Sequence, residues 1–122
     1  MKCPFCDINA DEVVLKNDLC YARYDRYPVN KGHLLIVTFR HADTYFDTTD
    51  EEKQALLHLI DESKKYLSEK YTPDGFNVGI NNGEAAGQTV MHFHCHVIPR
   101  YKGDVENPRG GVRGVIPGKM DY

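Results

Sequence analysis

The order of apolar and polar positions along the chain predicts short strands on either side of one amphipathic helix. Runs rich in apolar, aromatic and β-branched residues at 12–16 and 19–25 flank a polar turn, which indicates an antiparallel hairpin. A nearly continuous apolar run at 33–39 predicts a central, largely buried strand. Two further strands are expected at 76–80 and at 92–98.

The clearest helix signal begins after Thr49 and ends near Tyr71. Thr49 and Glu52 have the spacing of a capping box, and Pro73 disfavours helical geometry just before it. Residues at helical spacing form one buried face: Ala55, Leu56, Leu59, Ile60, Ser63, Tyr66 and Leu67. The chain therefore predicts an α+β domain, with a mostly antiparallel five-stranded sheet, one long helix and short helical turns.

The last predicted strand carries three of the six histidines of the chain. His92, His94 and His96 occupy alternate positions, so in an extended strand their imidazoles share one face. A glycine-containing loop at 81–89 leads into this strand and brings backbone donors beside it. Because a neutral imidazole can attack phosphorus while nearby donors stabilise the phosphate oxygens, the pattern indicates phosphate chemistry.

Metal binding is the alternative role for these histidines. Three histidines on one strand face can hold zinc in an open site that activates water. Cys3 and Cys6 have the C-x2-C spacing of a zinc half-site, which needs two more ligands; His41 and one of the three alternating histidines are available. Cys20 and Cys95 lie within predicted strands and are expected to be buried as small apolar residues.

Composition and charge narrow the class of protein. The 122 residues are 27% charged and 41% hydrophobic, which is ordinary for a soluble globular protein. The net charge of −3 gives no electrostatic case for a nucleic-acid or membrane partner, and no apolar run reaches the length of a membrane span. Four cysteines without a secretory signal predict reduced thiols, so we expect a cytoplasmic protein.

The segment from Gly87 to Ile98, GQTVMHFHCHVI, resembles the motif of the histidine triad (HIT) superfamily. Asp25, Pro28 and the run at 32–37 resemble the strand-loop-strand segment of that family. The loop at 81–89 is similar in length and glycine placement to the fragile-histidine-triad branch, which includes dinucleoside polyphosphate hydrolases. The resemblance covers about residues 3–104, which indicates a single HIT domain over 1–122 with an irregular basic arm at 105–122.

The resemblance implies a homodimer whose sheets join across a two-fold axis, and a nucleotidyl-histidine intermediate. The middle histidine, His94, would attack the α-phosphorus of a bound nucleotide, and water would then release a nucleoside monophosphate. The other catalytic residues that it implies are His96, His33, Gln88 and Thr89. The nucleotide-binding residues that it implies are Asp25 on the ribose, Asn81, Gln88 and Thr89 as polar contacts, and Phe5, Ile8 and Tyr24 in a base pocket.

The resemblance also implies one structural zinc ion per chain. Its ligands would be two cysteines near the N-terminus, Cys3 and Cys6, together with His41 and the first triad histidine, His92. That set leaves His94 and His96 free for catalysis. Arginines of the basic arm, Arg109 and Arg113, could reach the phosphate chain.

The function expected first is hydrolysis of dinucleoside polyphosphates, such as diadenosine tri- or tetraphosphate, with release of AMP. A nucleoside phosphoramidase would share the His94 intermediate and cleave a P–N bond instead. A transferase would pass the nucleotidyl group to another phosphate. The remaining alternatives are a nucleotide-binding regulatory protein with slow turnover and a metal-dependent hydrolase that uses all three triad histidines as ligands.

Overall fold

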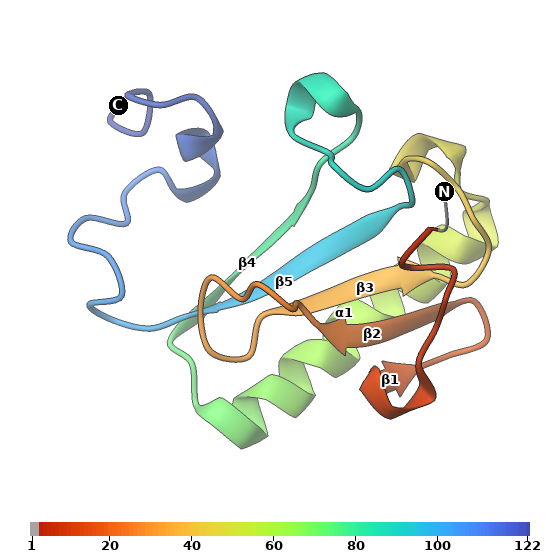
Figure 1. Cartoon of the computed structure of the whole chain (residues 1–122). Coiled ribbons are helices and arrows are strands. Elements are labelled where there is room, and N and C mark those ends of the chain that lie inside the picture. Colours follow the sequence, from red (N-terminus) through yellow and green to blue (C-terminus); the bar gives the residue numbers. More distant parts are fainter. Residues whose placement is uncertain (1–2) are drawn as a thin grey trace.

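Five strands form one antiparallel sheet, and one long helix runs along one of its faces (Figure 1). The structure is a computed structural model and describes residues 3–122, so residues 1 and 2 of the predicted domain lie outside the described part. The strand order is β1-β2-β3-β5-β4, which places β1 and β4 at the edges. The strand bounds are β1 Val13–Lys16, β2 Cys20–Tyr24, β3 Leu34–Thr38, β4 Gly75–Ile80 and β5 His94–Arg100. The predicted α+β architecture is confirmed.

Helix α1 (Asp50–Tyr71) begins and ends where the local signals predict. Thr49 accepts a hydrogen bond from the backbone N–H of Glu52, and the Glu52 carboxylate accepts one from the backbone of Thr49. At the other end, Thr72 takes a left-handed conformation with φ of 51°. The apolar face of the helix, including Leu59 and Leu67, packs on the sheet.

The two faces of the sheet follow from the alternation of side chains along each strand. Ala22, Ile36 and Cys95 point toward α1 and form the main core. The opposite face carries a smaller cluster in which the N-terminal segment supplies Phe5 against Leu35. His94 and His96 belong to this second face, which the helix leaves uncovered. The fold therefore keeps the predicted catalytic histidines away from the main core.

Strand β5 begins two residues later than the sequence suggested and continues through Pro99 to Arg100. His92 and Phe93 precede it, and the Phe93 backbone N–H donates to the carbonyl of Ala42 at 2.6 Å. His92 is thereby held at the start of the strand beside the loop that follows β3. Across the sheet, Leu35 of β3 pairs with His96, and Val37 pairs with His94.

Four 3-10 turns complete the fold. They are η1 (Ala10–Glu12), η2 (Tyr45–Asp47), η3 (Glu84–Ala86) and η4 (Gly111–Val115). The last lies in the C-terminal arm, which stands beside the end of the sheet and faces β4 (Figure 1). No helix within residues 3–122 is both long and apolar enough to cross a membrane.

Candidate functional site

The hydrogen bonding of His94 leaves one of its ring nitrogens free to react. Its Nδ1 lies 2.8 Å from the backbone oxygen of His92, and a carbonyl can only accept, so Nδ1 carries the proton. Nε2 then keeps its lone pair. The side chain lines a cavity of about 390 Å³, and the ring of Phe5 packs 5.0 Å away, centroid to centroid. His94 is therefore oriented as a nucleophile that faces a cavity.

His96 is oriented by a relay that starts at a backbone amide. The N–H of Val29 donates to Nδ1 of His33 at 3.2 Å, so the proton of the His33 ring sits on Nε2. That nitrogen lies 2.9 Å from Nδ1 of His96 and donates to it. Nε2 of His96 must then carry the remaining proton of the neutral ring. This Nε2–H group is a hydrogen-bond donor, and His96 lines the same cavity as His94.

Burial keeps these two imidazoles neutral at physiological pH. Desolvation lowers the pKa of His33, although the nearby Asp25 carboxylate works in the opposite direction. Desolvation, aided by the positive charges that His94 and His33 would carry when protonated, lowers the pKa of His96 to about 4. Asp25 lies 3.5 Å from Nε2 of His33. A neutral His96 can donate a hydrogen bond to a phosphate oxygen.

The loop before the triad supplies two residues that line the cavity and one residue whose side chain holds the loop in place. Asn81 and Thr89, which we expect to be polar contacts near a nucleotide, line the cavity. Gln88 is buried, and its amide is used by the backbone: Nε2 donates to the carbonyls of Asp43 and Val90 at 2.6 and 3.0 Å. Its Oε1 accepts the backbone N–H of Gly83. In this structure the amide of Gln88 therefore supports the loop, and its predicted role at the phosphate stays a prediction.

The predicted nucleotide pocket is partly corrected by the structure. Phe5 and Asp25 line the cavity, whereas Ile8 is exposed and does not. Tyr24 points to the helix face, where its hydroxyl lies 3.2 Å from the hydroxyl of Tyr66. Adjacent residues of a strand point to opposite faces, so Asp25 and Tyr24 could not both face the same cavity.

Arg23 lines the cavity and was not among the predicted site residues. It is 5% exposed, and its Nη2 lies 2.7 Å from Glu12. The signal that could have found it is strand alternation, because Arg23 lies two residues before Asp25 on the same face of the sheet.

A second cluster gathers the four predicted metal ligands. The ligand atoms of Cys3, Cys6, His41 and His92 all lie within 4.8 Å of one another. Nδ1 of His92 is 3.3 Å from the Cys3 sulfur and 3.4 Å from the Cys6 sulfur, and Nδ1 of His41 is 3.2 Å from the latter. Zinc bond lengths in a tetrahedron give nitrogen–sulfur separations of about 3.6 Å. The donor types and their spacing thus fit a closed Cys₂His₂ site.

The far nitrogens of both histidines in this cluster have acceptors. Nε2 of His92 lies 2.7 Å from the carbonyl of Thr38, and Nε2 of His41 lies 3.1 Å from the Asp43 carboxylate. These contacts place the ring protons on Nε2 and leave both Nδ1 atoms as donors of electron pairs, the arrangement usual behind metal-bound histidines.

The three triad histidines do not converge on one point. Within residues 3–122, His92 belongs to the cysteine cluster, and His96 belongs to a group with Asp25 and His33. His94 is in neither group. This separation disfavours the alternative in which all three bind one catalytic metal ion.

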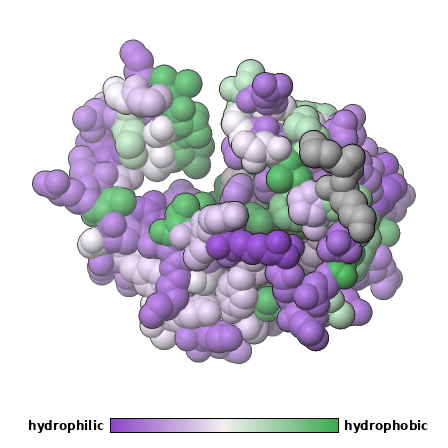
Figure 2. Space-filling model, viewed as in Figure 1, coloured by the Kyte–Doolittle hydropathy of each residue, from purple (hydrophilic) through white to green (hydrophobic). Residues whose placement is uncertain are grey.

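A larger hollow of about 560 Å³ lies between β4 and the C-terminal arm. Figure 2 shows this hollow, with hydrophobic side chains on the inner side of the arm. Val112 and Val115 of η4 line it, and His96 lies on its opposite wall. The arm thus extends the surface around the histidines with apolar residues.

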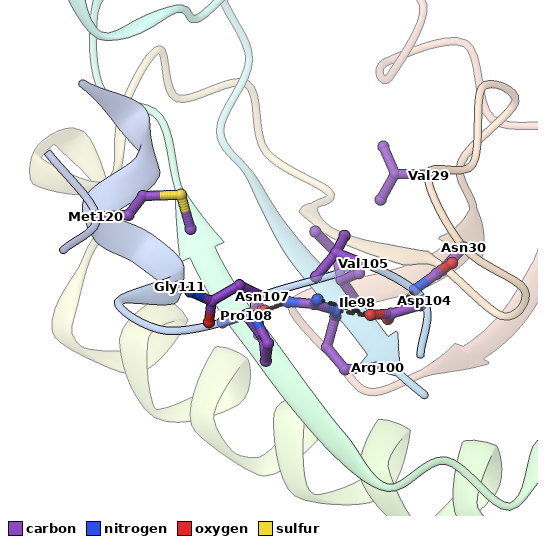
Figure 3. A pocket seen from close by; sticks show the side chains of 11 residues that line it. Val29, Asn30, Ile98, Arg100, Asp104, Val105, Asn107, Pro108, Gly111 and Met120 are labelled. Atoms are coloured by element: carbon purple, nitrogen blue, oxygen red, sulfur yellow. Dashed lines mark hydrogen bonds and ion pairs between the residues drawn. The ribbon is translucent and has the colours of Figure 1, made fainter. Parts of the chain in front are cut away.

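The arginines of the arm are directed to its own tail. Arg109 bonds the carbonyl of Tyr122, Arg113 bonds that of Lys119 at 3.0 Å, and both guanidinium groups lie over the Tyr122 ring. Neither arginine lines the cavity of His94 within this chain, and a contact with the phosphate chain, for example across a dimer, stays a prediction. At the base of the arm, Arg100 bonds Asn77 and Asp104 (Figure 3).

The fold and this site together define a class: an α+β protein with histidines on one strand face that line a cavity, and with a Cys₂His₂ cluster beside them. Residues 8–103 match the HIT domain, so the chain belongs to the HIT family. It is 36% identical over 107 residues to "Protein hit" of Bacillus subtilis, which covers 84% of this chain and 74% of that protein.

Two further relatives bear on the site. An AP-4-A phosphorylase of Mycobacterium tuberculosis is 38% identical over 107 residues, which cover 83% of this chain and 55% of that protein. The crystal structure of a Zn-bound histidine triad family protein from Mycobacterium smegmatis aligns with a TM-score of 0.76 at 32% identity. That alignment covers 85% of this chain and 78% of the other.

Proposed function

We propose that this protein hydrolyses dinucleoside polyphosphates through a nucleotidyl-histidine intermediate and releases a nucleoside monophosphate. The observation that carries the proposal is the tautomer of His94. Its Nδ1 donates to the carbonyl of His92, which leaves Nε2 free, and the side chain lines the cavity that His96 also lines. A nucleophile and a neutral donor at one cavity wall are the groups that phosphoryl transfer requires.

The reaction runs in two displacements at the α-phosphorus. Nε2 of His94 attacks, a P–N bond forms, and the P–O bond to the rest of the polyphosphate breaks. The Nε2–H of His96 donates to a phosphate oxygen and stabilises the charge that develops. Water then attacks the same phosphorus, and the P–N bond breaks. Diadenosine tetraphosphate and water thus give AMP and ATP.

Asp25 and the loop residues bind the nucleotide in this scheme. The Asp25 carboxylate can accept hydrogen bonds from both ribose hydroxyls. Thr89 and Asn81, which line the same cavity, offer polar contacts, and Phe5 offers an aromatic surface. Gln88 holds the loop that carries Thr89.

The second candidate is transfer to inorganic phosphate, which the similarity to an AP-4-A phosphorylase favours. The first displacement would be the same, but phosphate would replace water in the second. Diadenosine tetraphosphate would then give ADP and ATP. A nucleoside phosphoramidase would likewise share the first displacement and differ only in its leaving group.

We propose further that Cys3, Cys6, His41 and His92 bind a structural zinc ion. The donor set, its spacing and the acceptors behind both histidines support this assignment, as does the zinc-bound relative. When bound, the ion cross-links the N-terminal segment, the loop after β3 and the start of β5. The carbonyl of His92 would thereby be fixed, and with it the orientation of His94.

Product analysis tests the proposed function. Diadenosine tetraphosphate and an adenosine phosphoramidate would be incubated separately with the protein, with and without inorganic phosphate. We expect AMP and ATP from the tetraphosphate, independent of phosphate. His94→Ala should lower the rate by on the order of 10⁴-fold, because it removes the nucleophile. His58→Ala, an exposed helix histidine far from the site in sequence, is the matched control and should retain full activity.

Each other result identifies an alternative. ADP and ATP formed only with phosphate would indicate a phosphorylase, and faster turnover of the phosphoramidate would indicate a phosphoramidase. If neither substrate shows turnover that depends on His94, the hydrolase proposal is wrong and a nucleotide-binding role is favoured.

A further inference from the structure

Arg23 lies at one end of the cavity whose other end holds the reactive histidines. On the open face of the sheet, Arg23 of β2 pairs with Leu35 of β3, and Leu35 pairs with His96 of β5. Neighbouring strands are about 4.8 Å apart, so the backbones of Arg23 and His96 are separated by roughly 10 Å. Leu35 forms the apolar floor between them. The ring of Phe5 bridges the two ends: its centroid lies 5.9 Å from the guanidinium carbon of Arg23 and 5.0 Å from the ring centroid of His94.

The guanidinium of Arg23 is held in place before any ligand binds. Its Nη2 is 2.7 Å from the Glu12 carboxylate, and its central carbon lies 5.9 Å from the centroid of the Phe5 ring. Glu12 also bonds Arg26 at 2.9 Å, which fixes the carboxylate from a second side. An arginine that is already ordered loses little conformational freedom when it donates hydrogen bonds to a ligand.

One nitrogen of this guanidinium is not used by hydrogen bonds to the described residues. Within residues 3–122, Nη1 of Arg23 has no hydrogen-bond partner in the protein, and the only fully buried side-chain polar atom that lacks a partner is Ser63 Oγ. Nη1 is therefore not fully buried, and Arg23 is one of the residues that line the cavity. The side chain as a whole remains buried.

We propose that Arg23 reads the edge of the nucleobase and makes the site prefer 6-oxopurine nucleotides, with guanine or hypoxanthine, over adenine nucleotides. This inference rests on the proposed nucleotide-binding function. Guanine and hypoxanthine present two neighbouring acceptors, O6 and N7, which suit the donors of a guanidinium. Adenine presents N7 beside an amino group, which is itself a donor and meets the guanidinium unfavourably.

The placement of Asp25 agrees with this assignment. Asp25 follows Arg23 by two residues on the same strand face, about 7 Å along the chain. Arg23, Asp25 and His94 line one cavity, so a nucleotide with its phosphate at His94 and its ribose at Asp25 has Arg23 within the same cavity as a contact for its base. The competing role for Arg23 is a contact with the polyphosphate chain. Because Glu12 already neutralises much of its charge, this role is less well matched to the site.

Binding of mononucleotides tests the inference without relying on turnover. GMP, IMP and AMP would each be titrated calorimetrically into the full-length protein and into Arg23→Leu, Arg23→Lys and Arg100→Leu. We expect the wild type to bind GMP and IMP on the order of tenfold more tightly than AMP, the discrimination typical of a guanidinium on this base edge. Arg23→Leu should bring the ratio close to one.

The other variants separate charge from geometry. Arg23→Lys keeps the positive charge and loses the planar fork, so it should lose most of the preference. Arg100→Leu removes an arginine that is also paired with a carboxylate at 2.7 Å, but at the base of the arm, and should keep the wild-type ratio. Melting temperatures of all variants, with Arg23→Lys as the gentler change, show whether each one is folded.

Three results would overturn the inference. The first is a wild-type preference for AMP, and the second is a ratio of GMP to AMP affinity that is unchanged in both Arg23 variants. The third is an equal decrease in the affinity for all three nucleotides in Arg23→Leu, which would indicate a phosphate contact. If AMP and GMP bind equally while turnover still depends on His94, only this inference fails. If no mononucleotide binds the wild type, the proposed function fails with it.

Discussion

At the scale of single residues, the site is governed by which nitrogen of each imidazole carries the proton. A carbonyl at 2.8 Å sets the tautomer of His94, and the relay from Val29 through His33 sets that of His96. The two rings are close neighbours, with centroids 5.3 Å apart, yet one presents a lone pair and the other a proton. Backbone groups thus assign two different chemical roles to two identical side chains.

The depressed pKa of His96 predicts a loss of stability in acid. In the unfolded chain, histidine binds a proton near pH 6.5, whereas burial lowers the pKa of His96 in the folded protein to about 4. Between these values the unfolded state binds more protons, so the free energy of unfolding should fall as the pH decreases from 6.5 to 4. The loss from this residue is up to about 3 kcal/mol, since one pKa unit corresponds to about 1.4 kcal/mol.

Urea unfolding at several pH values measures this effect. His96→Asn removes the titrating group from both states, so the decrease between pH 6.5 and 4 should be smaller in the variant than in the wild type. The contribution of His33, whose pKa is also lowered, remains in both proteins. Equal slopes in the two proteins would show that His96 does not titrate as described.

The alternation of histidines and the C-x2-C spacing pointed to the site, and the family resemblance added His33 and the full set of zinc ligands, but neither predicted every side-chain direction. The family resemblance implied a base pocket that includes Tyr24, but the position of Tyr24 in the strand turns it to the helix. Gln88 was expected at the phosphate, but its amide is used by three backbone groups of nearby loops. Such tertiary hydrogen bonds join residues as far apart as Asp43 and Gln88, and no local pattern reports them.

At the scale of elements, the cysteine cluster joins three segments that are distant in sequence. The N-terminal segment carries Cys3 and Cys6, the loop after β3 carries His41, and His92 lies just before β5. The same N-terminal segment supplies Phe5, which covers His94. A cross-link at this point would therefore hold both Phe5 and the start of β5 in place.

Metal content tests the proposed zinc site. Protein purified without chelator should contain one zinc ion per chain, and Cys3→Ser should lose most of it. We expect chelation or Cys3→Ser to lower the melting temperature markedly, because structural zinc contributes directly to folding free energy. Cys95→Ala is the matched control: it removes a buried thiol that lies in the core and should retain zinc. Zinc retained in full by Cys3→Ser, or absent from the wild type, would contradict the assignment.

Some elements were predictable from local signals and others were not. Helix α1 follows its capping box at Thr49 and its stop before Pro73, both of which act within a few residues. The folded C-terminal arm depends instead on contacts between its two ends. Gly110 has a positive φ of 86°, and Met120 lies against it so closely that a side chain there would clash. The sequence showed a basic irregular segment and could not show this packing.

At the scale of the whole molecule, α1 covers one face of the sheet, and the open face carries His94 and His96. The N-terminal segment and the loop before the triad surround the histidines on that face, and the arm adds an apolar wall beyond β4 (Figure 2). The homodimer that the resemblance implied stays a prediction. Strand β4 is an edge of the sheet, and the mass in solution, against 13.9 kDa for one chain, tests the predicted dimer.

The central claim is that His94 becomes covalently attached to the nucleotide, and the stereochemistry at phosphorus tests it most directly. A diadenosine polyphosphate with a chiral α-phosphorothioate would be hydrolysed in ¹⁸O-labelled water, and the configuration of the released nucleotide determined. Two successive in-line displacements, first by His94 and then by water, predict net retention. Net inversion would mean that water attacks directly, and would contradict the nucleotidyl-histidine intermediate.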